Sequence, residues 1–430
     1  MTRLSLLFAF VIACQFTTAQ AATQPTTRRQ SPNIVLILCD DLGITNIGYC
    51  GADAPFRTPH IDALAKQSLR FDRCFSAPIC GPTRAQIMTG QYSFRHGVID
   101  NATAAKLNPA EDLVMPQVMR KAGYKTAGAG KWSQLEYLVT KEDGNRWGFD
   151  EFMLWTGFGT DDRYWAPRFN HNGTVRSWDD KTYGPDVLQQ FVVEFMANHR
   201  DEPFFVYYSH PIPHAPRART PDSANPSPDR WEMYADQVTY LDKQVGLFVK
   251  ELERLGLRDN TLILFTGDNG AVFNESVRNG GIGGTIRGRW LDGGKGSAGE
   301  GACRVPMFVS WPAVIREGRE CNDLIDCSDF LPTFCELAGT ALPPDYAHDG
   351  RSFAPQIHGQ RGTPREWVYA ALHRSQDPIR WVRDDHWRLT GGGVLTSVQN
   401  APYGDIHVND SEPKAKAARI RLQGVLDSLK

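Results

Sequence analysis

Short apolar runs that alternate with amphipathic stretches are the feature that most restricts the fold of this chain. Five of these runs are predicted to be buried β-strands, at residues 33–38, 124–129, 204–208, 261–265 and 305–309. Between the third and fourth runs, apolar residues recur at helical spacing from Val238 to Leu255, and Gly256 ends the pattern. This alternation predicts an α/β fold, in which a large, mostly parallel sheet is covered by helices on both faces.

Polar residues stand where each predicted strand ends. In strand order they are Asp40 and Asp41, then Lys131, then His210 and His214, then Asp268 and Asn269, while Lys295 precedes the fifth strand. Taken singly, an aspartate after a strand is often a helix cap or turn former. In open α/β sheets, however, ligands bind beyond the carboxyl ends of the strands. The whole set therefore predicts a site at one sheet edge.

The ligand types at this edge favour a hard cation. Carboxylate and amide oxygens, without histidines or cysteines at zinc spacing, suit Ca²⁺ or Mg²⁺. A cation held by Asp40, Asp41, Asp268 and Asn269, with lysines nearby, would bind an oxyanion and neutralise charge that develops on it. Sulfate or phosphate esters are the substrates that this chemistry indicates.

The N-terminus has the pattern of a secretory signal peptide. Arg3 precedes an apolar stretch from Leu4 to Ala13, and Ala19-Gln20-Ala21 forms a cleavage site, so we expect a signal at 1–21 and an unstructured lead-in at 22–31. Val11-Ile12-Ala13-Cys14 also resembles a lipobox, so a lipoprotein anchored through Cys14 is the alternative. The predicted location is secreted or periplasmic, and no other run is apolar enough to span a bilayer.

Charge and cysteine content exclude several classes of protein. A formal net charge of -2 and a pI near 6.6 argue against nucleic-acid or polybasic membrane binding. Nine cysteines are too few for a disulfide scaffold. Most are expected to be small core residues, with Cys321 and Cys327 a possible disulfide.

Cys80 differs from the other cysteines because it begins the sequence Cys80-Gly-Pro-Thr-Arg84 and is followed by Thr89-Gly90. This segment resembles the signature of the type I, formylglycine-dependent sulfatases of the alkaline phosphatase superfamily. Other motifs agree with the family in the same order: NIVLILCDDLG, AGAGKW, GFDEF, PIPHAP, LFTGDNG and GKGSAGEGACRVPMFVSWP. The resemblance covers residues 31–355 and loosens beyond them.

The resemblance implies a catalytic role for each matching residue. Cys80 would be oxidised during export by a formylglycine-generating or sulfatase-maturing enzyme, which replaces a soft thiol with a hard oxygen ligand and a nucleophilic hydroxyl. Asp40, Asp41, Asp268 and Asn269 would hold Ca²⁺ together with the oxidised Cys80. Arg84 would fix the hydrate, Lys131 and Lys295 would contact the sulfate, and His214 would protonate the leaving alcohol.

Ser133 departs from the family pattern, which places a histidine two residues after the lysine of the AGAGKW motif. That histidine is thought to assist sulfate release as a base, so either His210 substitutes for it or Ser133 makes room for a differently oriented sugar. We assign Ser133 and His210 to substrate binding.

The domain prediction is a catalytic domain at 32–364 and a small α+β subdomain at 365–430. In the subdomain, PIRWVRDDHWRLT is expected to form strands and Ser411 to Lys430 a capped helix. The tyrosine-rich ending typical of the family is not evident.

The predicted activity is hydrolysis of a sulfate ester, and the predicted substrate is a sulfated carbohydrate. The carbohydrate assignment depends on export, on the resemblance and on the aromatic segment LWTGFGTDDRYWAPRFNHNG, whose rings can stack on sugars or pack in the core. The alternatives are a phosphate or phosphonate ester hydrolase of the same superfamily and a non-catalytic protein that binds sulfated glycans.

Overall fold

A computed structural model of the chain describes residues 31–132, 140–155, 163–223, 229–272, 285–373, 378–408 and 412–429. Ser133, the predicted signal peptide and part of the aromatic segment lie outside the described residues. From Ser31 onward the chain forms one compact unit by its contacts. The boundary at 364 and 365 stays a prediction.

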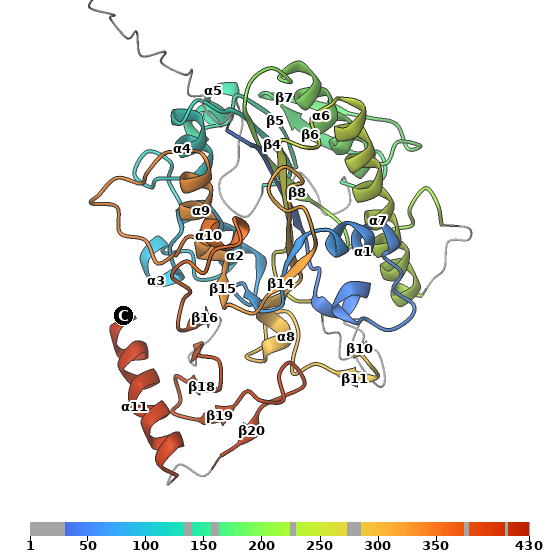
Figure 1. The fold of residues 1–430 in the computed structure, drawn as a ribbon. Helices are drawn as coiled ribbons and strands as arrows, with labels where there is room; N and C mark the ends of the chain where they lie inside the picture. Colours follow the sequence, from blue (N-terminus) through green and yellow to red (C-terminus); the bar gives the residue numbers. More distant parts are fainter. Residues whose placement is uncertain are drawn as a thin grey trace, which may run out of the picture. The chain divides into compact units, whose positions relative to one another are not determined.

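A ten-stranded sheet is the centre of the fold (Figure 1), and its strand order is β14-β2-β13-β9-β1-β8-β4-β5-β6-β7. The strands are β1 (Asn33–Cys39), β2 (Leu69–Phe71), β4 (Lys125–Lys131), β5 (Glu151–Trp155), β6 (Arg168–His171), β7 (Thr174–Ser177), β8 (Phe204–His210), β9 (Thr261–Gly267), β13 (Met307–Ser310) and β14 (Arg319–Cys321). The five central strands β9, β1, β8, β4 and β5 are parallel. The predicted mostly parallel sheet is therefore confirmed, although β13 pairs antiparallel with β9.

Buried on both faces, β1 shows why these runs form a central sheet. Ile34, Leu36 and Leu38 belong to one hydrophobic core, and the alternating residues Val35 and Ile37 belong to a second core. Successive side chains of a strand point to opposite faces, so an unbroken apolar run requires cover on both sides.

Two layers of helices supply that cover. On one face pack α2 (Cys80–Thr89), α4 (Met115–Lys121), α5 (Lys141–Trp147), α9 (Phe330–Leu337) and α10 (Ala354–Ile357). On the other face pack α1 (Pro59–Lys66), α6 (Gly184–Asn198) and α7 (Arg230–Arg254). Figure 1 shows the two layers on either side of the sheet, which is seen nearly edge-on. Helix α7 is the helix predicted from the spacing of Val238 to Leu255.

A separate antiparallel sheet forms near the C-terminus, with strand order β16-β17-β18-β19-β20. Its strands are β16 (Val368–Leu372), β17 (Ile379–Arg383), β18 (Trp387–Thr390), β19 (Leu395–Ser397) and β20 (Ile406–His407), and α11 (Pro413–Ser428) contacts β17 and β18. We call these five strands the C-terminal sheet. The expected strands and terminal helix of this region are confirmed.

The remaining elements are short. They are α3 (Ser93–His96), α8 (Glu300–Cys303), the 3₁₀ turns η1 (Ile44–Asn46), η2 (Gly48–Cys50), η3 (Ala104–Lys106) and η4 (Cys327–Asp329), and the strands β3 (Cys74–Phe75), β10 (Thr285–Ile286), β11 (Arg289–Trp290), β12 (Arg304–Val305) and β15 (Ile325–Asp326). Val305, predicted to begin the fifth strand, belongs to β12 instead.

The suggested disulfide between Cys321 and Cys327 is wrong, because both cysteines are free. Cys321 ends β14 in the large sheet and is partly exposed, whereas Cys327 is buried in η4, which follows β15 of a different sheet. Burial raises the pKa of Cys327 well above its usual value, and a hydrogen bond with Cys74 adds to that increase. Cys327 is therefore a core thiol.

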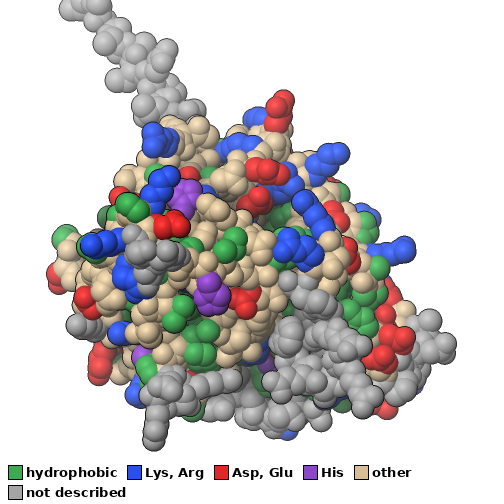
Figure 2. Space-filling view, turned by 90° about the horizontal axis from the view of Figure 1, so that it is seen from below, with side chains coloured by type: hydrophobic (Ala, Val, Ile, Leu, Met, Phe, Trp, Pro, Cys, Tyr) green, Lys and Arg blue, Asp and Glu red, His purple; other side chains and the backbone are tan. Residues whose placement is uncertain are grey.

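The described surface shows no broad field of one charge in the view of Figure 2, where basic and acidic side chains are interspersed. Among the described residues, no helix has the length and apolar character that crossing a membrane requires.

Candidate active site

The carboxyl end of β1 carries the first two acidic residues of the site. Asp40 and Asp41 are each 1% exposed, and β1 lies between β8 and β9. The backbone N–H of Asp41 donates to Asp268 Oδ1 at 3.0 Å. Asp41 has a φ of 64°, in the left-handed region that aspartate tolerates better than most residues. The turn therefore holds the Asp41 backbone against the Asp268 carboxylate.

Lys131 reaches the site from the end of β4. Its Nζ lies 2.9 Å from Asp40 Oδ1 and 2.7 Å from Oδ2, and its side chain is buried. The preceding Gly130 has a φ of 93°, and a Cβ atom there would lie 1.8 Å from the carbonyl oxygen of Ser209. Only glycine fits between the two parallel strands at this point, and it allows the chain to turn Lys131 toward Asp40.

Helix α2 brings Cys80 and Arg84 to the same place. Cys80 is the first residue of the helix and is 1% exposed. The next N–H, that of Gly81, donates to Asn101 Oδ1 at 2.9 Å, which satisfies one of the free amides of the first turn. Pro82 is compatible with this turn because a proline there removes no intrahelical hydrogen bond. One turn later, Arg84 projects from the same helix.

Arg84 joins the strand ends through its guanidinium. Nε and Nη2 lie 3.0 and 2.7 Å from Asp268 Oδ2, and Nη1 donates to Tyr207 at 3.2 Å and to Ser209. The N–H groups of a buried arginine need hydrogen-bond acceptors. Those of Arg84 find them on β8 and on the residue that follows β9. Arg84 is thereby fixed next to the carboxylates.

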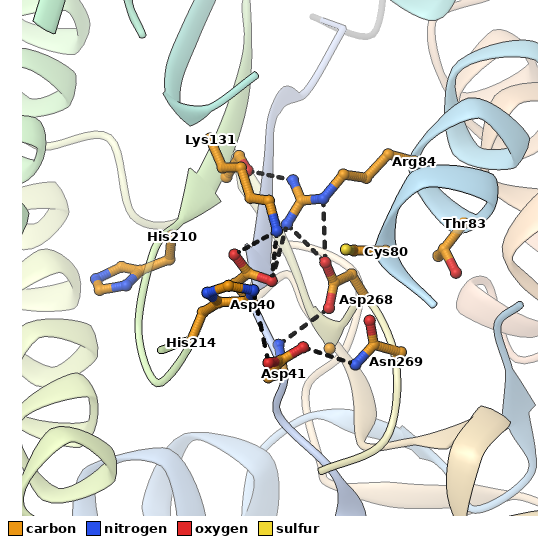
Figure 3. A network of polar contacts seen from close by, with 12 residues as sticks. Asp40, Asp41, Cys80, Thr83, Arg84, Lys131, His210, His214, Asp268 and Asn269 are labelled. Atoms are coloured by element: carbon orange, nitrogen blue, oxygen red, sulfur yellow. Dashed lines mark hydrogen bonds and ion pairs between the residues drawn. The ribbon is translucent and has the colours of Figure 1, made fainter. Parts of the chain in front are cut away.

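Asn269 and His214 lie next to Asp41 (Figure 3), and Lys295 completes the cluster. Asn269 Nδ2 donates to Asp41 Oδ1 at 2.9 Å, and Lys295 Nζ contacts the same oxygen. His214 Nε2 lies 3.8 Å from Asp41 Oδ2. The side chains of His214 and Lys295 are 23% and 15% exposed, so these two residues face solvent more than the others do.

Neighbouring charges set the ionisation of the two adjacent aspartates. Burial alone would raise the pKa of Asp41, but Lys295 and His214 lower it to about 2. Burial also opposes ionisation of Asp40, whereas His214, Lys131 and Arg84 hold the pKa of that carboxyl well below its usual value. Burial lowers the pKa of His214 to about 4, despite attraction to Asp40 and Asp41. At neutral pH both carboxylates are therefore charged and the imidazole is neutral.

Two overlapping groups of side chains have metal-ligand geometry. The ligand atoms of Asp40, Cys80 and Asp268 lie within 4.8 Å of one another, as do those of Asp40, Asp41 and His214. Asn269 Oδ1 is buried and has no hydrogen-bond partner among the described residues. An orphaned amide oxygen beside three carboxylates fits a hard cation.

His210 is not part of this cluster. Its Nε2 lies 2.7 Å from Gln244 Oε1 of α7, and the N–H of Ile212 lies 3.4 Å from Nδ1. Figure 3 shows the ring directed away from the carboxylates. The expected contact of His210 with substrate, or its use as a replacement base, therefore has no support in its position, because both nitrogens face the core.

Two further residues near the cluster were not predicted from the sequence. Asn101 holds the start of α2, with its Oδ1 3.6 Å from Cys80 Sγ. Arg163 Nη2 lies 3.0 Å from His214 Nδ1. No motif in the sequence marks either residue, and only the three-dimensional structure reveals these contacts.

Comparison with known proteins gives a family match over most of the chain. A family profile described as Sulfatase matches residues 32–340. The chain is 29% identical to N-acetylgalactosamine-6-sulfatase of Homo sapiens over 363 residues, covering 76% of this chain and 66% of that protein. It is 29% identical to steryl-sulfatase of Rattus norvegicus over 438 residues, covering 81% and 74%. The chain thus spans about two thirds to three quarters of the length of these relatives.

The solved structure of Ps i-CgsB superposes over nearly the whole chain. The TM-score is 0.79 at 27% identity, with 93% of this chain and 92% of that chain covered. A structure of Ps i-CgsB in complex with k-i-k-neocarrahexaose matches with the same TM-score at 26% identity and the same coverage.

Proposed function

Because the chain belongs to the sulfatase family, we propose that it hydrolyses a sulfate ester of a sulfated carbohydrate through a formylglycine formed from Cys80. The observation that carries this proposal is the position of Cys80, whose sulfur lies with carboxylate oxygens of Asp40 and Asp268 in one group of potential ligand atoms. A thiol is a poor ligand for a hard cation, whereas its oxidised, hydrated form would offer oxygen. The location of Cys80 is thus better suited to the modified residue.

Ca²⁺ is the proposed cofactor, and Mg²⁺ is the alternative. Asp40, Asp41, Asp268 and Asn269 would hold it, and all four offer oxygen ligands. The ion would supply Lewis-acid stabilisation of the charged sulfate, and the hydrated formylglycine would supply the attacking hydroxyl. Three carboxylates are already balanced by Arg84, Lys131 and Lys295, so a divalent ion would make the centre attractive to an anion.

The chain's own residues would bind and orient the ester. Lys131 and Lys295 would contact the sulfate oxygens, and Arg84 would fix residue 80 from the next turn of α2. His214 Nε2 would provide the proton for the leaving alcohol, since a neutral imidazole can still donate its N–H. The greater exposure of His214 and Lys295 supports their placement on the substrate side.

The names of relatives support a carbohydrate substrate but do not restrict the class to it. One relative is named for N-acetylgalactosamine 6-sulfate, and Ps i-CgsB was solved with a neocarrahexaose. Steryl-sulfatase is a comparably similar relative. We therefore keep the substrate as a proposal, together with the alternatives of a phosphate or phosphonate ester hydrolase and a sulfated-glycan-binding protein.

Export and maturation also remain proposals. The signal at 1–21, the alternative anchor at Cys14 and a secreted or periplasmic location are supported by the sequence pattern alone. A formylglycine-generating or sulfatase-maturing enzyme is the partner that oxidation of Cys80 requires. Ser133 would either slow sulfate release or widen the space for the sugar.

Peptide mass spectrometry and sulfate release would test the proposal together. We expect the peptide that contains Cys80 to carry formylglycine and the protein to prefer a sulfate monoester over the phosphate monoester of the same alcohol. Cys80→Ala is the matched inactive control. A fully active protein with an unmodified, alkylatable Cys80 would contradict the mechanism, and preference for the phosphate ester would contradict the activity.

A further inference from the structure

Arg163 is the exception among the buried arginines of the described residues. Arg84, Arg163, Arg365, Arg383 and Arg388 are each at most 9% exposed. Four of these five form an ion pair: Arg84 with Asp268, Arg365 with Asp329, Arg383 with Glu300 and Arg388 with Asp405. Arg163, which is 3% exposed, forms no ion pair with a carboxylate in the described ranges. A buried charge without a counter-charge is unfavourable, so its retention requires a reason.

The acidic cluster nearby does not supply the missing charge. Each of its carboxylates already lies against a cation: Asp268 pairs with Arg84, Asp40 with Lys131 and Asp41 with Lys295. The negative charges of the three carboxylates are therefore matched by three positive charges. The charge of Arg163 is an additional positive charge.

The surroundings of Arg163 hold its guanidinium in place without neutralising it. Its Cζ lies 4.2 Å from the ring centroid of Trp155 and 5.2 Å from that of Tyr164. Nη2 lies 3.0 Å from His214 Nδ1, and Nε has no hydrogen-bond partner among the described residues. Aromatic faces stabilise an arginine but leave its donors available for an oxyanion.

Arg217, on the loop that carries His214, repeats this arrangement. Its Cζ lies 4.4 Å from the ring centroid of Tyr234, its Nη1 is buried without a partner, and it too forms no ion pair within the described part of the chain. Burial raises the pKa of Tyr164 to about 12, and the charges of Arg163 and Arg217 both oppose that increase. Among the described residues, Arg163 and Arg217 are thus two cations without a paired carboxylate that both act on Tyr164.

We propose that Arg163, assisted by Arg217, binds a second oxyanion on the sugar that bears the reacting sulfate. This inference rests on the proposed function, since His214 would contact the leaving oxygen of that sugar and Arg163 contacts His214. A guanidinium matches sulfate or carboxylate geometry with parallel N–H donors. The preferred substrates are then saccharides that carry a second sulfate or a carboxylate, and a singly charged sulfate ester is a poorer substrate.

Matched pairs of substrates test this preference. Suitable pairs are N-acetylgalactosamine 6-sulfate with its 4,6-disulfate, and glucosamine 6-sulfate with its 2-N,6-O-disulfate. For the accepted pair, we expect kcat/KM of the wild type to favour the doubly charged member at least about tenfold, as a charge-assisted hydrogen bond provides. In Arg163→Met this ratio should fall to about one. An equal ratio in the two proteins would overturn the proposal while leaving the sulfatase activity intact.

Thermal unfolding does not depend on turnover, so it decides the question even if neither pair is hydrolysed. Removing an unpaired buried charge should not lower the unfolding temperature, whereas the matched control Arg365→Met should lower it because Asp329 is left unpaired. Inorganic sulfate, compared with chloride at equal ionic strength, should raise the unfolding temperature of wild type more than that of Arg163→Met. Destabilisation of Arg163→Met as large as that of Arg365→Met, with no difference in the sulfate effect, would show that Arg163 is a packing residue.

Discussion

Buried charges occur in two regions of this protein, and their arrangement differs. At the carboxyl edge of the large sheet, three aspartates crowd together and share Arg84, Lys131 and Lys295. Where the C-terminal sheet meets the rest of the fold, acids and arginines alternate, because Glu300 pairs with Arg383 and Arg304. Arg388 likewise pairs with Asp405 and Asp292. Like charges that crowd together raise the free energy of the folded protein and suit ligand binding. Contacts between opposite charges instead suit the junction between two parts of the fold.

The two regions are connected through the loop that carries Lys295. Arg388 of β18 donates through Nη1 to the carbonyl oxygen of Ala298 at 3.1 Å, and its Nη2 lies 3.4 Å from Asp292 Oδ2. The backbone N–H of Lys295 donates to the carbonyl oxygen of Ala271 at 2.9 Å. The pairs of the C-terminal sheet therefore hold the segment on which a proposed sulfate contact depends.

The largest effect is expected in the crowded region, at Asp268. Asp268→Asn should reduce sulfate release by about 10³-fold or more, because it removes a proposed metal ligand and a charge from the centre. Chelation by EDTA should reproduce this loss. Asp268→Ala should in addition destabilise the fold by about 3–5 kcal/mol, because Arg84 is left buried without its partner.

Thermal unfolding separates these two variants, and Glu320→Gln, in an exposed pair with Arg70, is the control. Full activity of Asp268→Asn or of the chelated protein would show that the crowded region holds no metal that activity requires. An unchanged unfolding temperature for Asp268→Ala would show that buried Arg84 does not need the Asp268 carboxylate for stability.

A smaller effect is expected when the connection between the regions is cut. Arg388→Met should raise KM about tenfold with a lesser change in kcat, because the loop no longer presents Lys295 accurately. Arg388→Lys should restore part of the affinity. We expect Arg73→Met to leave KM unchanged, although Arg73 also reaches the C-terminal sheet through Asp385 at 2.9 Å. Equal KM values in the Arg388 and Arg73 variants would mean that the two regions act independently.

The last effect is on stability rather than on catalysis, and it concerns His96 of α3, a buried group with no counter-charge among the described residues. Burial lowers its pKa from the usual 6.5 to about 3. The folded protein thus keeps His96 neutral while the unfolded chain binds a proton below about 6.5, so stability is present above that pH and falls as the pH drops toward 3. The loss is about 1.4 kcal/mol per pH unit in this window.

Urea unfolding of wild type and His96→Gln at pH 7.5 and 4.5 measures this contribution. The variant should lose less stability than wild type on acidification. Parallel losses in the two proteins would show that His96 opens to solvent before global unfolding.

Much of the fold and of the cluster was predictable because both follow from local sequence. Apolar runs specify strands that are buried on two faces, and the residues after parallel strands must meet at one edge, as Asp40, Lys131 and Asp268 do. The antiparallel pairing of β13 with β9 was not predictable, because an apolar run does not specify whether a strand pairs parallel or antiparallel. The disulfide prediction failed because sequence proximity of Cys321 and Cys327 hides their assignment to different sheets.

The residues that sequence reasoning missed act across long separations. Asn101 supports α2 from an irregular segment, and Arg163 meets His214 from 51 residues away. His210 was misplaced for the opposite reason, because alternation along β8 directs its side chain to the core although it stands at a strand end. Position along a strand was predictable, but the direction of a side chain required the register of the sheet.

The backbone of Asp41 has a consequence for how this sequence can diverge. A left-handed conformation costs a residue with a side chain about 1 kcal/mol, and glycine would adopt it freely. Selection for folding alone would therefore drift this position toward glycine or asparagine. Aspartate persists only while its carboxylate is useful, so the residue found here in a descendant of this chain reports whether that lineage has kept its chemistry.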